Sequence, residues 1–111
     1  MITKIKEIRK EAEEVIKAIL TKNNLEKLDL SDLDCGSCSP VIQEDAFDAN
    51  NNFTLDSVSI KNGELSFDGS SSCDNSWWNT NSISTDALVN IACFIENHEE
   101  EIEDYAKEIN E

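Results

Sequence analysis

Positive charge is the scarcest property of this sequence, which has nine Lys and Arg against 24 Asp and Glu and a net charge of −15. Residues 1–22 carry six basic and four acidic side chains, residues 23–95 two and twelve, and residues 96–111 one and eight. A surface this negative repels nucleic acid and anionic lipid and attracts basic proteins. We therefore expect no direct binding of nucleic acid and no membrane association.

Long apolar runs, glycine and proline are scarce as well. No stretch reaches the ~18 apolar residues that a membrane-spanning helix needs, and three Gly and one Pro leave room for long regular elements. The length of 111 residues fits one domain, 1–111. The first residues lack the apolar segment of a secretion signal, so we expect a cytoplasmic protein with reduced cysteines.

Apolar residues recur at helical spacing at both ends of the chain. In residues 3–22 they are Ile5, Ile8, Ala12, Val15, Ile16 and Ile19. The opposite face, which includes Arg9, has the composition of solvated polar surface. In residues 84–110 the series is Leu88, Ile91, Ile95, His98, Ile102, Tyr105 and Ile109. We expect one long helix there, capped by Ser84 or Thr85, whose C-terminal part extends past the core.

The middle of the chain has β patterning. Asn62-Gly63 lies between two alternating segments and predicts a tight hairpin with Val58, Ile60, Leu65 and Phe67 on one face. The alternation changes parity at Asp56-Ser57, which predicts a bulge or break. Segments 25–30 and 41–47 are further strand candidates, and Trp77-Trp78 is a possible start of another. The expected class is α+β, a small antiparallel sheet of about three to five strands with helices on one face.

No catalytic motif is present. The lone histidine, His98, has no nucleophile or carboxylate placed toward it by a motif, so we expect neither an enzyme nor a cofactor. The acidic segments 32–34 and 48–52 lack the Gly and Glu positions of a calcium loop and are read as polar turns.

The four cysteines give a weak metal signal. Cys35 and Cys38 form a C-x-x-C pair that Cys73 would extend, but a second pair is missing. Cys93 lies on the opposite side of the predicted helix from the face that includes His98. We expect no metal, and a zinc-stabilised adaptor using Cys35, Cys38 and Cys73 is the third hypothesis.

The two tryptophans are adjacent, and neighbouring residues of a strand point to opposite faces. We therefore expect one of Trp77 and Trp78 to be buried and the other exposed. An exposed Trp among polar residues has the profile of a binding hot spot.

Acidic residues crowd the end of the chain, where like charges at i,i+3 and i,i+4 destabilise a helix. This arrangement suggests a cationic partner. The candidate partner-binding residues are Glu96, Glu99, Glu100, Glu103, Asp104 and Glu108, together with Trp77 and Trp78.

The leading hypothesis is a small binding protein that presents carboxylates to a basic protein, such as a nucleic-acid-binding enzyme. In size and charge the chain resembles phage-encoded inhibitors of restriction or CRISPR enzymes and other DNA mimics. That resemblance is one of composition only. The alternative is an acidic interaction or assembly module, a homodimer through the helix seam, with no connection to nucleic acid.

The cysteine spacing generates a first prediction. Elemental analysis of protein purified without chelator should find no stoichiometric zinc, because the fourth ligand is awkwardly placed. About one zinc per chain, lost together with folding in Cys35→Ser or Cys38→Ser, would support the adaptor hypothesis instead.

Overall fold

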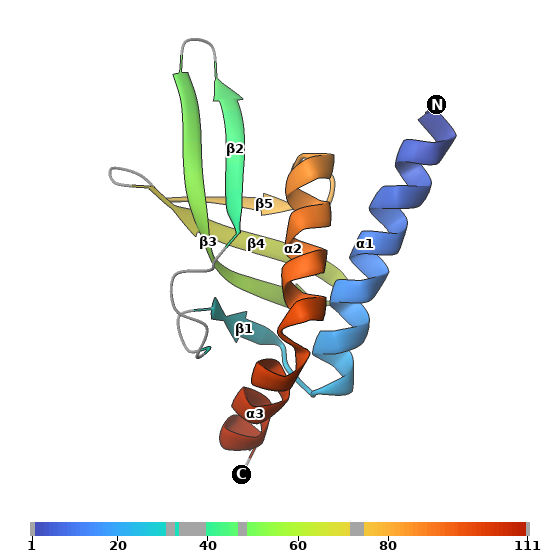
Figure 1. Ribbon diagram of the computed structural model, residues 1–111, viewed down its shortest axis with the longest axis vertical. Coiled ribbons are helices and arrows are strands. Elements are labelled where there is room, and N and C mark those ends of the chain that lie inside the picture. Colours follow the sequence, from blue (N-terminus) through green and yellow to red (C-terminus); the bar gives the residue numbers. More distant parts are fainter. Residues whose placement is uncertain (1, 31–32, 34–39, 47–48, 72–74, 111) are drawn as a thin grey trace.

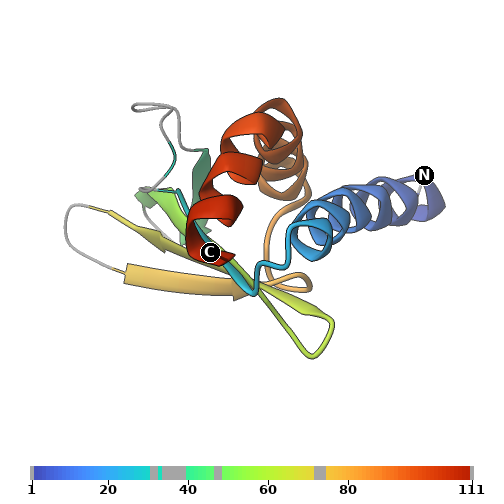
Figure 2. The same cartoon turned by 90° about the horizontal axis from the view of Figure 1, so that it is seen from below.

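The computed structural model describes residues 2–30, 33, 40–46, 49–71 and 75–110. The elements in order are α1 (Ile2–Lys22), β1 (Lys27–Asp29), β2 (Val41–Ala46), β3 (Ala49–Lys61), β4 (Glu64–Ser70), β5 (Asn75–Asn79), α2 (Thr85–Asn97) and α3 (Glu99–Asn110). The strands form one antiparallel sheet. The helices gather on one face of this sheet (Figures 1 and 2), which confirms the α+β class.

The predicted hairpin is present between β3 and β4. Asn62 and Gly63 have φ values of 55° and 79°, the left-handed backbone that a two-residue hairpin turn requires. Lys61 pairs with Glu64, and Val58 pairs with Phe67 three positions further on. Asparagine and glycine reach these φ values at low cost, so the turn sets the register of both strands.

Strand β3 is the centre of the sheet. Its first half pairs with β2 and its second half with β1 along the same edge, whereas β4 occupies the other edge. The register against β4 shifts between Leu55 and Ser57, which confirms the predicted irregularity. The extra residue lets Leu55 and Val58 both face the core although they are three apart.

The polar segment 49–52 is a strand rather than the turn that we expected, since it belongs to β3 and pairs with β2. The strand that we considered at Trp77-Trp78 is present as β5, Asn75–Asn79, beside β4. Asparagine has a low preference for strands. Pairing with segments distant in sequence outweighs that preference here.

Helix α1 ends as the sequence predicts but is anchored by a residue that we assigned to solvent. Asn24 has a φ of 56°, and the Leu25 amide donates to the Leu20 carbonyl at 2.9 Å, which closes the helix end. The exception on the polar face is Arg9, which is half-buried. Its guanidinium donates to Thr85 Oγ1 at 2.8 Å and to the carbonyls of Thr80 and Ile83 at 2.5 and 2.9 Å.

The core lies between the sheet and the helices. Its largest fully buried side chains are Ile16, Leu20, Leu28, Leu55, Leu65, Phe67, Leu88, Ile91, Ile95 and Ile102. Trp78 joins this core with 4% of its surface exposed, and its ring meets Phe53 edge to face at 5.3 Å. A Cβ built on Gly69 would lie 3.1 Å from the Trp78 ring, so a glycine makes room for the indole.

The predicted helix over 84–110 is present as two helices, with Ser84 as the N-cap of α2. The division falls at His98, whose ring stacks on Phe94 with a centroid distance of 4.1 Å. His98 Nδ1 donates to the Phe94 carbonyl at 2.8 Å. The Ile102 amide still donates to the His98 carbonyl at 3.0 Å. The chain turns here, so that Ile102 and Ala106 of α3 reach the core instead of running past it.

The opposite environments of the two tryptophans generate a second prediction. Trp78→Ala should lower the free energy of unfolding by about 3–5 kcal/mol, because it leaves a cavity beside Phe53 and Gly69. Trp77→Ala, which removes an indole with 64% of its surface exposed, should change it by less than about 1 kcal/mol. Urea denaturation of both variants tests this, and equal losses would contradict the assignment of one Trp to the core.

Candidate protein-binding surface

The structure separates the acidic residues of the C-terminal helices into two sets. Glu96, Glu100, Asp104 and Glu108 are all exposed and follow one another at intervals of four residues. We call these four the acidic row. Glu99 and Glu103 face α1 instead, where Lys22 Nζ lies 3.7 Å and 3.5 Å from their carboxylates.

Helix α3 is attached to the end of α1 by polar contacts as well as by Ile102. In addition to the Lys22 ion pairs, Asn110 Nδ2 donates to the Asn23 carbonyl at 3.2 Å. The Lys22 pairs are largely exposed, so each contributes less than about 1 kcal/mol. These contacts orient α3 so that the acidic row points to solvent.

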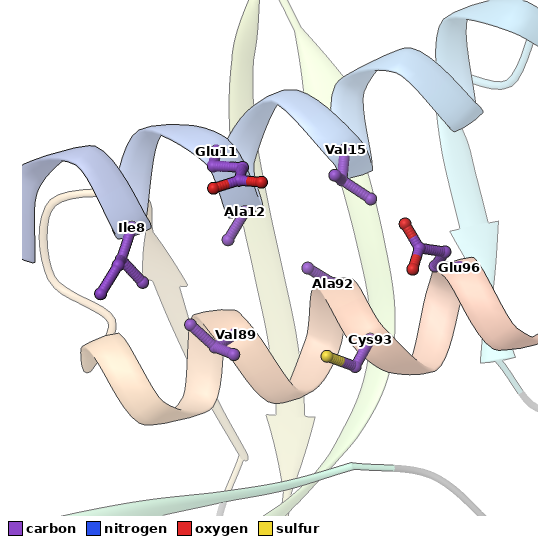
Figure 3. A pocket seen from close by; sticks show the side chains of 8 residues that line it. All are labelled: Ile8, Glu11, Ala12, Val15, Val89, Ala92, Cys93 and Glu96. Atoms are coloured by element: carbon purple, nitrogen blue, oxygen red, sulfur yellow. The ribbon is translucent and has the colours of Figure 1, made fainter.

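A groove between α1 and α2 borders the acidic row (Figure 3). It has a volume of about 210 Å³, and its apolar lining is Ile8, Ala12, Val15, Val89, Ala92 and Cys93. The carboxylates of Glu11 and Glu96 stand at its rim, one from each helix. Because Glu96 belongs to both features, the groove and the acidic row form one continuous surface.

The apolar face of α1 continues beyond the part that the core covers. Ile5 and Ile8 belong to the predicted apolar face, and 48% and 40% of their surfaces are exposed. The first turns of α1 extend past the sheet (Figure 1), so none of the strands in the described ranges covers them. They add exposed apolar surface next to the groove.

The tryptophans do not belong to this surface. Trp78 is buried in the core. Trp77 therefore points from the sheet face that the helices leave open, since adjacent strand residues alternate. Beside it on that face lies Asp68, its register partner, whose Oδ2 accepts a hydrogen bond from Ser57 Oγ at 3.2 Å. The predicted binding residues thus lie on two opposite faces of the sheet.

The described residues contain neither a metal-binding cluster nor a membrane-spanning helix. No group of three or more His, Cys, Asp or Glu among them is arranged to hold a metal ion. Cys35, Cys38 and Cys73 lie outside the described residues. His98 uses Nδ1 within its own helix turn. Among the helices of the described ranges, none has the length and apolar character to cross a membrane.

Comparisons with protein-family models, with curated proteins and with solved structures give no match to this chain. This surface is therefore the feature from which a function can be inferred. Sequence reasoning missed the groove. Two signals for it were present: an α1 apolar face longer than a small core can cover, and Val89, which lies off the apolar seam of α2.

The groove generates a third prediction, which separates binding residues from structural ones. Ile8→Ser should change the free energy of unfolding by less than about 1 kcal/mol, because Ile8 is already exposed. Ile16→Ala on the same helix should cost about 2–5 kcal/mol, because Ile16 is fully buried. Thermal or urea unfolding measures both, and a large loss in Ile8→Ser would assign the groove lining to stability.

Proposed function

We propose that this protein is a small acidic binding protein whose acidic row and α1–α2 groove receive a cationic segment of a basic partner protein. The observation that carries this proposal is the acidic row: Glu96 at the end of α2, and Glu100, Asp104 and Glu108 on successive turns of α3, all of them exposed. Repulsion along such a row destabilises the helices that carry it. A cationic partner relieves that repulsion.

The groove specifies the form of the partner segment. An apolar lining with Glu11 and Glu96 at its rim complements an amphipathic helix that has apolar anchors on one side and Lys or Arg beside them. Such a helix would place its anchors between α1 and α2. Its basic residues would then meet Glu96 and continue toward Glu100.

The charge spacing of α3 supports a nucleic-acid-binding enzyme as the partner class. The twelve residues of α3 include six carboxylates. Glu99 and Glu103 pair with Lys22, so at a rise of ~1.5 Å per residue the other four give one charge per ~4.5 Å of axis. This is of the same order as the ~3.4 Å per phosphate of a single DNA strand. We infer that α3 would enter a phosphate-binding channel of such an enzyme in place of nucleic acid. Inhibitors of restriction or CRISPR enzymes that phages encode belong to this class.

A homodimer through the helix seam would have less exposed apolar surface than the sequence predicted. Leu88, Ile91, Ile95 and Ile102 of the predicted seam are fully buried in the core. A dimer through the helices would have to use the exposed ends of the apolar faces, where Ile5, Ile8 and Ile109 lie.

Neutralising the acidic row tests the proposal. The variant Glu96→Gln, Glu100→Gln, Asp104→Asn and Glu108→Gln should stay folded and gain helix stability, because like-charge pairs are removed. Its affinity for a synthetic Lys- and Leu-rich amphipathic helix should fall about tenfold or more, and the salt dependence of binding should flatten. Fluorescence anisotropy with a labelled peptide across a salt series measures both effects.

A matched control removes the same charge elsewhere. Glu14→Gln, Glu26→Gln, Asp56→Asn and Glu64→Gln are four exposed positions outside the acidic row. This control should keep most of the affinity, because the peptide binds the row and not the net charge. The proposal fails if the two variants bind alike, and the acidity would then serve solubility.

A further inference from the structure

Strand β5 lies at the margin of the sheet. The strand order is β1-β3-β4-β5, and in the described ranges no strand pairs with the outer edge of β5; Figure 2 shows β5 away from the helical layer. Proteins usually protect such edges with charged residues, proline or a bulge. Residues 75–85 contain no charged residue and no proline, in a chain with 24 acidic side chains.

The backbone of Asn79 shows which way the β5 groups point. Its amide donates to Ser82 Oγ at 3.0 Å, and its carbonyl accepts from the amides of Ser82 and Ile83, both at 3.1 Å. These partners lie in the turn after β5 and not in β4. Because backbone direction alternates along a strand, Trp77 and Asn75 also turn their N–H and C=O groups to the outer edge.

The hairpin leads independently to the same orientation. Lys61 and Glu64 close a two-residue turn and therefore exchange hydrogen bonds with each other. Alternation from Glu64 then directs Phe67 and Gly69 away from β3 and toward β5. Their register partners are Trp78 and Ser76. Ser76 and Trp78 thus bond to β4, whereas the N–H and C=O of Trp77 face the open edge.

We propose that two copies of this chain associate reversibly by antiparallel pairing of their β5 strands about a two-fold axis at Trp77. Trp77 is the middle residue of Asn75–Asn79, so the pairing is self-complementary. Each Trp77 exchanges two backbone hydrogen bonds with Trp77 of the second copy. Asn75 lies opposite Asn79 of the other copy, but the outward backbone groups of Asn79 are bonded within its own turn, so the backbone pairing is confined to Trp77.

The side chains of β5 favour a second copy of this chain as the partner strand. The two Trp77 indoles, each 64% exposed in the single chain, become cross-strand neighbours on the open face. Asn79 Oδ1 accepts from the amides of Asn81 and Ser82, both at 2.9 Å, which leaves Asn79 Nδ2 to donate to Asn75 Oδ1 of the other copy. No charge is present in either strand, whereas contact over most other surfaces would bring carboxylates together. The contact is small, and it therefore fits a weak, concentration-dependent dimer.

This contact is independent of the proposed function. Trp77 and the β5 edge belong to the sheet, and the acidic row and the groove belong to the helices on its other face. A dimer formed in this way leaves both of its cationic-partner surfaces open.

Amide hydrogen exchange on the full chain, read residue by residue over a roughly hundredfold range of concentration, tests the geometry. The Trp77 amide should exchange about tenfold or more slowly at the highest concentration than in dilute protein. The Ser76 and Trp78 amides, which bond to β4, should be protected at both. A Trp77 amide whose exchange does not depend on concentration would overturn the proposal.

Sedimentation equilibrium of variants tests the residues. Trp77→Pro removes the outward N–H and the indole without removing a bond to β4, so it should be monomeric with a native circular dichroism spectrum. Trp77→Lys is the second variant, in case proline disturbs the strand, and should also be monomeric. Trp77→Phe should retain the dimer. Ile8→Ser is the control for association through the helices and should have no effect.

Three outcomes reject this proposal. The wild-type chain is monomeric throughout; the dimer persists in Trp77→Lys; or Ile8→Ser, and not Trp77→Lys, abolishes it. The last result would move self-association to the α1–α2 groove.

Discussion

Burial of a single face of the sheet is the constraint on which the other features of this protein depend. Phe67 and Val58, paired across β4 and β3, are fully buried beneath the helices. Because strand side chains alternate, burying Phe67 and Trp78 sends their neighbours Asp68 and Trp77 to the open face. The helices bury one side against the sheet and present charged residues on the other. The molecule thus has two unlike surfaces, a flat polar sheet face and an acidic helical face.

Two local irregularities keep that core continuous. The extra residue in β3 corrects the parity between Leu55 and Val58, and without it one of them would face solvent. Gly69 leaves space that the Trp78 indole fills against Phe53. Both irregularities lie near the middle of the sheet. Gly69 also determines where Trp77 points. It makes room for the buried Trp78 indole, and Trp77, as the adjacent strand residue, must then face the opposite way.

The acidic helix α3 depends on tertiary contacts for its existence. Six carboxylates in twelve residues oppose helix formation, and short isolated helices are marginal in water even with favourable sequences. Burial of Ile102 and Ala106, the Lys22 ion pairs and the Asn110 bond hold α3 in place. A row of carboxylates can then be presented to a partner on a rigid support. The proposed binding surface therefore consists of carboxylates whose mutual repulsion is offset by the contacts that hold α3 in place.

The sequence by itself determined the local features: the Asn62-Gly63 turn, the Ser84 cap, the parity break before Ser57 and the opposite exposure of the two tryptophans. Each of these depends on residues within a few positions of one another. The tertiary structure decided the pairing of Ala49–Asn52 with β2, the division of the last helix at His98 and the groove between α1 and α2. It also decided which carboxylates are free and which face Lys22. Arg9 gives the physical reason, because it binds Thr85 across 76 residues of chain. Contacts of this kind arise only when packing brings distant segments together, and no local pattern of charge or hydrophobicity encodes them.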